Sequence, residues 1–177
     1  MDAVFRAGRA LGRADVLRLI RGKDGSTYLR EAATCLSSTA VPALHQVADS
    51  LNGIANNWRS QKDQIPAITP RVQAAGPKEY HAVSAGIWMG IALESCVQVD
   101  EDTVTADCKA RIAEALENAR GHVEALRLQG ILPNMSDFNG PFRSEISGVT
   151  AVRQTGEFRA HFSLIQGLSN QAGNAIR

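Results

Sequence analysis

The segment Lys78–Cys96 constrains the fold of this chain more than any other, because its apolar residues fall on every side of a helix. These residues are Ala82, Val83, Ala85, Ile87, Trp88, Met89, Ile91, Ala92 and Leu93. A helix that is apolar all round belongs at the centre of a fold or of an assembly. The charge-poor run Tyr80–Leu93 is shorter than the ~20 residues that a membrane span needs. We therefore expect no transmembrane segment, and the rest of the chain must supply the partners of this helix.

Two further segments have helical periodicity. In Val41–Arg59, Pro42 suits the first helical turn, where its missing N–H is not needed. The apolar residues of this segment recur at steps of three and four; they are Leu44, Val47, Ala48, Leu51, Ile54, Ala55 and Trp58. A second helix is predicted from Thr103 to about Gln129, with a packing seam at Ile112, Leu116, Ala119, Val123 and Leu126. Gly130 and then Pro133 follow in the order that ends helices.

The N-terminal residues 2–21 are rich in arginine and fit a helix, although Gly8 and Gly12 weaken the prediction. Gly22 and Gly25 stop that helix. A short helix is expected after Ser26 or Thr27, both of which are good cap residues.

Two segments predict less regular structure. Residues 60–77 contain Pro66, Pro70, Gly76 and Pro77 in a polar context, which indicates a long non-helical loop of the kind that often carries function. Residues 131–177 hold four of the five Phe residues and predict short helices near 141–147 and 157–168. The tail 169–177 is small and polar and is expected to be mobile.

Length and composition indicate one globular domain. The chain has 177 residues, of which 44% are apolar and 21% charged, and this balance permits a single packed core. The net charge of +1 is unevenly distributed: residues 1–23 hold six basic and two acidic groups, whereas residues 94–117 hold two basic and seven acidic groups. No dense basic patch is visible outside the N-terminal helix.

The sequence contains no assembled catalytic site. It has no GxGxxG, Walker-type, GxSxG or HExxH motif. The three cysteines form no CxxC pair, and the four histidines have no HxH or HxxxH spacing, so we expect neither a disulfide framework nor a metal site. Each cysteine fits an inert core thiol. We predict that the protein is not an enzyme and needs no cofactor, metal or small-molecule substrate.

Short matches spaced along residues 28–149 give a resemblance to the coat proteins of rod-shaped plant RNA viruses, the tobamovirus type and its relatives including benyviruses. They are YLREAATCLSS, the pair Asn57-Trp58, EYHAVSAGIWMGIAL, HVEALRLQG and MSDFNGPF, with a Pro-rich polar segment after the second. The resemblance implies an antiparallel up-down four-helix bundle, here with an extra basic N-terminal helix and a C-terminal extension of short helices. It also implies a homopolymer that holds single-stranded RNA between stacked subunits.

The sequence departs from that family where RNA is bound. The family has arginines directly after the helix that matches Tyr80–Leu93, whereas this chain has ESCVQVDED. Acidic residues that the family places early in its long helix fall near Cys108 and Lys109. We therefore choose RNA contacts from the local basic residues, which are Lys109, Arg111, Arg71 and Lys78.

The acidic group Glu94, Asp100, Glu101 and Asp102 suggests a second role. In a helical stack these carboxylates would face those of a neighbouring subunit, which would raise their pKa values and loosen the assembly when protons or Ca²⁺ are lost. A simpler alternative is that the three consecutive carboxylates cap the following helix.

These observations divide the chain into a basic N-terminal helix (1–22), a helical bundle core (23–149) and a C-terminal extension with a mobile tail (150–177). The predicted function is a capsid subunit of the virion, made in the host cytoplasm, with no membrane partner. The first alternative is a small helical binding or effector module whose basic amphipathic N-terminal helix engages an acidic partner or a membrane surface. An enzyme whose site is assembled only in the fold is the third hypothesis.

Overall fold

The computed structural model describes residues 2–98 and 106–130, and every regular element in these ranges is helical. The helices are α1 (Asp2–Leu19), α2 (Ser26–Ser37), α3 (Pro42–Asn56), α4 (Trp58–Gln61), the 3₁₀ helix η1 (Lys62–Ala67), α5 (Ile68–Gln73), α6 (Pro77–Gln98) and α7 (Ala106–Leu128). The predicted all-α class is confirmed for these residues. The short helices expected near 141–147 and 157–168, and the tail 169–177, lie outside them.

Several helix ends follow local sequence rules. Pro42 stands in the first turn of α3, where no intrahelical partner for its nitrogen is required. Beyond α7, Gly130 adopts φ = +70°, the left-handed conformation in which helices commonly end. Both features agree with the sequence prediction.

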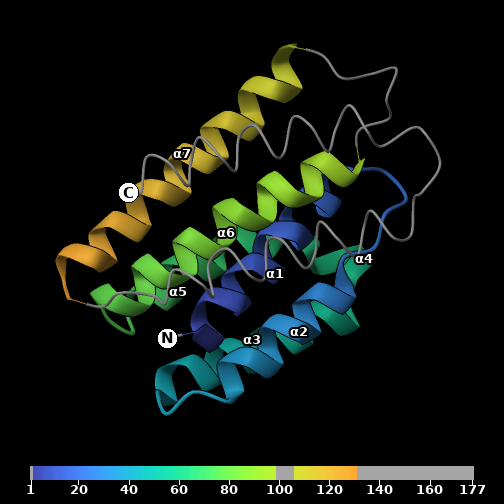
Figure 1. Cartoon of the computed structure of the whole chain (residues 1–177). Coiled ribbons are helices and arrows are strands. Elements are labelled where there is room, and N and C mark those ends of the chain that lie inside the picture. The colour runs from blue at the N-terminus through green and yellow to red at the C-terminus, as the bar shows by residue number, and fades with distance from the viewer. Residues whose placement is uncertain (1, 99–105, 131–177) are drawn as a thin grey trace, which may run out of the picture.

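The long helices pack in the order α3, α2, α1, α6, α7 (Figure 1). Short connections make α1 antiparallel to α2, and α2 antiparallel to α3. The helices α1 and α6 run parallel, because Gly8 lies at Val83 and Gly12 lies further along at Ile87. Since His81 near the start of α6 faces His122 near the end of α7, these two helices are antiparallel. Helix α5 contacts both α3 and α6 and so closes the main core.

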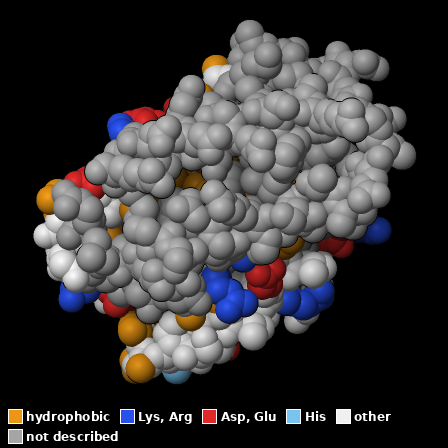
Figure 2. Space-filling model, viewed as in Figure 1, with side chains coloured by type: hydrophobic (Ala, Val, Ile, Leu, Met, Phe, Trp, Pro, Cys, Tyr) orange, Lys and Arg blue, Asp and Glu red, His pale blue; other side chains and the backbone are white. Residues whose placement is uncertain are grey.

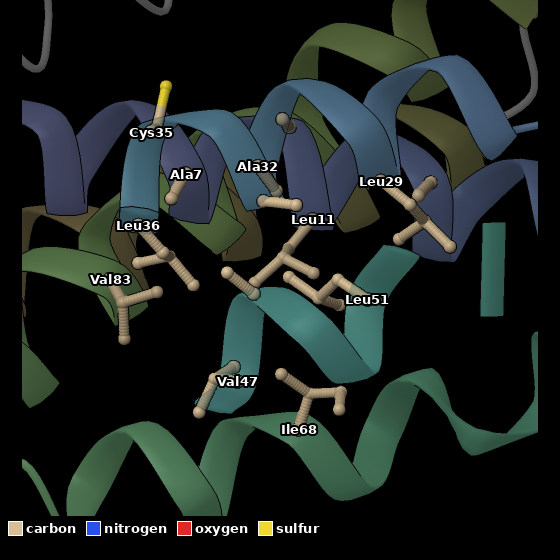
Figure 3. Close-up of a cluster of buried hydrophobic side chains, with 14 of the residues drawn as sticks. Ala7, Leu11, Leu29, Ala32, Cys35, Leu36, Val47, Leu51, Ile68 and Val83 are labelled. Carbon is tan, nitrogen blue, oxygen red and sulfur yellow. The ribbon is translucent and has the colours of Figure 1, made fainter. Parts of the chain in front are cut away.

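Helix α1 is part of this core rather than an addition to it. It contributes Val4, Ala7, Ala10, Leu11, Ala14 and Leu17. Figure 3 shows Ala7 and Leu11 of α1 close to Leu36 of α2 and Leu51 of α3. The separate unit 1–22 expected from the sequence therefore has its apolar face buried between α2 and α6.

Glycines explain how α1 and α6 come so close. A Cβ added to Gly8 or Gly12 would lie less than 3.0 Å from a backbone carbonyl oxygen of α6. The same holds in reverse for Gly86 and Gly90, which face the backbone of α1. The two backbones therefore touch directly, with each helix carrying glycines four residues apart on its contact face. The glycines that weaken the helix prediction are the residues that make this interface.

The opposite side of α6 forms a second core with α7. Its members are Ala85, Met89, Ala92, Leu93, Ile112, Ala115, Leu116, Ala119 and Val123. Helix α6 is apolar all round because α1 covers one side and α7 another. The sequence prediction of a central helix is confirmed.

The non-helical loop predicted for residues 60–77 is wrong, because α4, η1 and α5 occupy most of it. Pro70 is the third residue of α5, within the first turn, where backbone N–H groups have no intrahelical acceptor. Ile65, Ile68 and Val72 are buried at steps of three and four and anchor the segment to the core. The prolines stand at positions that short helices tolerate. The helical spacing of the buried apolar residues therefore predicts this segment better than its proline content does.

Candidate nucleic-acid interface

Two of the predicted RNA contacts lie on neighbouring elements. Arg71 in α5 and Lys78 in the first turn of α6 are both exposed. Arg71 Nη1 donates a hydrogen bond of 2.7 Å to Ser50 Oγ on α3. A hydroxyl partner leaves the positive charge of the guanidinium in place, so Arg71 still fits a phosphate contact.

The other two predicted contacts, Lys109 and Arg111, belong to the first turns of α7, and their side chains are outside what the structure describes. Because α7 is antiparallel to α6 with His122 opposite His81, Lys109 falls roughly at the level of Glu94. That level is about 16 residues, or ~24 Å, along α6 from Lys78. The structure therefore does not bring the four residues together in one site.

Of the predicted intersubunit carboxylates, Glu94 lies within the described residues, and it is buried. Glu94 is 2% exposed, and its Oε2 accepts a hydrogen bond of 2.8 Å from Arg13 Nε on α1. Its Oε1 accepts one of 2.6 Å from Gln98 Nε2. Because Glu94 is enclosed with a partner from its own chain, it is not placed to face a neighbouring subunit, as the sequence prediction requires. The other three carboxylates of that prediction, Asp100, Glu101 and Asp102, lie outside the described ranges.

A basic surface that the sequence analysis missed lies where the turn after α1 meets α4 (Figure 1). We call it the basic end surface, and its members are Arg18, Arg21, Lys23, Arg30, Arg59 and Lys62. Lys62 Nζ donates a hydrogen bond of 2.7 Å to the carbonyl oxygen of Arg18. Trp58 Nε1 donates one of 3.1 Å to the carbonyl oxygen of Lys23. These bonds hold α4 and η1 against the end of α1.

The local sequence explains the shape of this turn. Gly22 adopts φ = +80°, a left-handed conformation that favours glycine. Asp24 Oδ1 then accepts a hydrogen bond of 2.8 Å from the backbone N–H of Ser26, the first residue of α2. A Cβ on Gly25 would lie 2.7 Å from Cη2 of Trp58, so glycine lets the indole ring cover the turn.

Three acidic residues lie among the six basic ones. Arg18 pairs with Asp15, and its Nη1 is 3.7 Å from Asp63 Oδ1. The backbone N–H of Ser26 is the main cause of the lowered pKa of Asp24, and Arg30 and Arg59 contribute smaller effects. The surface keeps a formal surplus of three positive charges, and Arg21, Lys23 and Arg59 are exposed. Figure 2 shows, on one face of the molecule, that Lys and Arg side chains have Asp and Glu side chains close to them.

The basic residues of this surface come from two segments that are far apart in the sequence, so neither segment alone predicts the surface. The N-terminal excess of positive charge is visible in the sequence, but it points to the whole helix 2–21. In the structure Arg9 is buried and Arg13 pairs with Glu94, so much of the charge of α1 faces inward. Lys62 is 44 positions along the chain from Arg18, and only the fold brings it and Arg59 to the end of α1.

No family model, curated protein or solved structure matches this chain. The resemblance to rod-shaped virus coat proteins therefore depends on the sequence features described above. Within the described ranges, no cluster of three or more His, Cys, Asp or Glu side chains is arranged to hold a metal ion. In the same residues, no helix is both long and apolar enough to cross a membrane.

Proposed function

We propose that this chain is a structural coat subunit that self-assembles helically around single-stranded RNA. The observation that carries the proposal is the basic end surface, where exposed Arg and Lys side chains from separate segments give a positive surplus. A few phosphate contacts per subunit are sufficient in a polymer, because many copies bind one strand and their energies combine. The near-neutral net charge of the whole chain is compatible with such a role.

The helix arrangement gives a second line of support. The four-helix bundle implied by the resemblance consists of two antiparallel pairs, and α2/α3 and α6/α7 are antiparallel pairs in this chain. Helix α1 lies between the two pairs, which makes the proposed subunit an expanded form of that bundle. We propose a homopolymer of such subunits in a virion, assembled in the host cytoplasm.

Three separate groups of residues are candidates for contact with RNA. They are the basic end surface, the neighbouring Arg71 and Lys78, and the start of α7 with Lys109 and Arg111. Because Lys78 and Lys109 are separated by ~24 Å along α6, one RNA path need not use all three groups. The basic end surface is the favoured contact, since its charges converge from several elements.

The alternative function, in which a basic amphipathic N-terminal helix engages an acidic partner or a membrane, has less support than the coat function. Such a helix needs a free basic face, whereas Arg9 is buried and Arg13 forms an ion pair within the chain. The end of α1 remains accessible, and binding to anionic vesicles without RNA binding would favour this alternative.

Electron microscopy and RNA binding test the proposal together. The purified chain should form rods or discs, and a single-stranded RNA should bind with an affinity that falls with salt. Replacing both Arg21 and Arg59 with Ala should lower the slope of log K against log salt by about 1.4, since each phosphate contact to a single strand contributes about 0.7.

Arg120→Ala is the matched control, because Arg120 is a partly exposed arginine on α7 that pairs with Glu117. It should leave the slope unchanged. The double variants R71A/K78A and K109A/R111A report on the other two contacts. A chain that stays monomeric at high concentration and binds no RNA would contradict the proposed function.

A further inference from the structure

Two histidines meet across the interface between α6 and α7. His81 Nδ1 lies 3.0 Å from His122 Nδ1, and the centroids of the two rings are 5.3 Å apart. The Tyr80 ring stands edge-on to His122 at 88°, with 5.6 Å between centroids. Both imidazoles are intermediate in burial. The contact joins the first turns of α6 to the last turns of α7.

The chemistry of this contact limits its protonation. Two ring nitrogens at hydrogen-bond distance share one proton: one Nδ1–H donates, and the other Nδ1 accepts with its lone pair. The acceptor ring must be neutral and carry its proton on Nε2, while the donor ring carries one on Nδ1. If both rings were doubly protonated imidazolium cations, two Nδ1–H donors and two positive charges would face each other at this distance.

The described surroundings offer little to neutralise a second positive charge. On α6, Lys78 precedes His81 by one turn and Ser84 follows it by one turn; on α7, Asn118 and Leu126 stand one turn from His122. Glu79, Arg120 and Glu124 are two positions from the histidines and so project from other sides of their helices.

One further carboxylate, that of Asp15, lines a cavity next to the histidine pair. Tyr80, Ser84 and His122 line a cavity of about 320 Å³ that reaches η1, α5 and Asp15 of α1. Asp15 pairs with Arg18 and is therefore already compensated. Loss of hydration is the main cause of the lowered pKa of His122, and the charge of His81 adds to it.

We propose that His81 and His122 form a proton-sensitive latch that holds the C-terminal half of α7 against α6. The latch is closed while at least one ring is neutral, because the Nδ1 atom of that ring can accept the proton of the other. When both rings are protonated, no acceptor remains and two positive charges face each other, so this half of α7 opens more often. The remaining apolar contacts of α7, such as Leu116 and Ile112, limit the opening to the region around the pair.

The direction of the pH effect follows from the lowered pKa of His122. When α7 opens, His122 regains its ordinary pKa of about 6.5 and binds a proton more readily than in the closed state. Closure is therefore fully favourable above about pH 6.5 and weakens as the pH falls below it. This inference concerns one chain and does not depend on the proposed coat function.

Hydrogen exchange tests the latch. Protection factors of α7 amides near His122, corrected for the intrinsic pH dependence of exchange, should fall at least about threefold between pH 7.5 and pH 5.5. Amides of α2 and α3 should not follow this change. In His122→Gln the titrating ring is replaced by a side chain that can still hydrogen-bond, so the response should disappear while α7 remains protected at pH 7.5.

His45→Gln is the control, because His45 is exposed and its Nε2 lies 2.8 Å from the carbonyl oxygen of Thr39, away from α7. It should keep the full pH response. His81→Gln provides a second latch variant if His122→Gln fails to fold. Equal protection of α7 at both pH values in the unaltered chain would overturn the proposal, as would a response that persists in both Gln variants.

Nitrogen NMR gives an independent readout. At pH 7.5, one of the two imidazoles should be the Nδ1–H tautomer and its partner the Nε2–H tautomer. The single Gln variants assign the signals to His81 and His122. Two Nε2–H tautomers at pH 7.5 would contradict the latch, because neither ring could then donate a proton across the contact.

Discussion

Helix α6 meets its two long neighbours in different ways. Against α1 it presents glycines, so that backbone touches backbone, and the partly buried Arg13–Glu94 pair lies further along the same interface. Against α7 it presents side chains, among them Met89 and His81. A backbone contact cannot adjust by changing a rotamer, whereas a side-chain contact can. We therefore expect the α1–α6 interface to tolerate little change and the α6–α7 interface to be adjustable.

The largest expected effect comes from adding one methyl group at the rigid interface. In Gly86→Ala the new Cβ would lie 2.7 Å from the backbone nitrogen of Arg9 and closer still to the carbonyl oxygen of Phe5. The two helices must separate, and we expect a loss of about 3 kcal/mol or more in the free energy of unfolding. Urea denaturation followed by circular dichroism measures it. A loss below about 1 kcal/mol would show that the interface can adapt.

The next largest effect concerns the ion pair at the same interface. Glu94→Ala leaves the Arg13 guanidinium, whose side chain is 16% exposed, without its buried carboxylate. We expect a destabilisation of about 3 kcal/mol, because Arg13 loses a buried carboxylate that accepts its hydrogen bond at 2.8 Å. The exposed pair of Arg120 and Glu117 is the control, and Glu117→Ala should change stability by less than about 0.5 kcal/mol. Equal effects in the two variants would remove the distinction between the pairs.

A smaller effect is expected at the side-chain interface. Met89 is buried between α6 and α7, and Met89→Leu conserves volume with a different shape. Repacking should hold the loss below about 1.5 kcal/mol. Comparison with Gly86→Ala, on the same helix three residues away, tests the contrast directly. If Met89→Leu proved the more damaging of the two, the proposed difference between the faces of α6 would be reversed.

The smallest effect should have the opposite sign. Gly121 in α7 is exposed, and a Cβ built there meets nothing within 4 Å. Gly121→Ala should stabilise the protein by about 0.5–1 kcal/mol, because alanine loses less backbone entropy in a helix. The midpoint of thermal unfolding should rise accordingly. A decrease would indicate that residues outside the described ranges contact this position.

Helices with a clear side-chain periodicity can be predicted from the sequence. Contacts that depend on small residues or on distant segments of the chain cannot. The stripe of α3 and the all-round apolar pattern of α6 are sufficient to place both helices. Gly8 and Gly12 look like weaknesses of α1, since propensity describes an isolated helix and their partners, Gly86 and Gly90, are almost 80 residues away.

The candidate interface is predicted less well for the same reason. Arg71 and Lys78 are exposed, which a phosphate contact would require. The pairing of Glu94 with Arg13 joins residues 81 positions apart and has no local signal. The basic end surface likewise depends on α4 and η1 lying against the end of α1. The contact between His81 and His122 cannot be predicted from the sequence, because each histidine is isolated in the chain. Only the antiparallel register of α6 and α7 brings the two side chains together.

The parallel contact between α1 and α6 has a consequence for the timing of folding. During synthesis at about 5–20 residues per second, the glycines of α1 precede those of α6 by roughly 4–16 s. For this interval α1 can pack only against segments that precede α6, such as α2 and η1, and the face that carries Gly8 and Gly12 has no partner. Small residues and regularly spaced arginines expose little apolar surface on that face. The small residues of α1 that allow the close contact with α6 therefore also leave little apolar surface exposed on α1 until α6 has been synthesised.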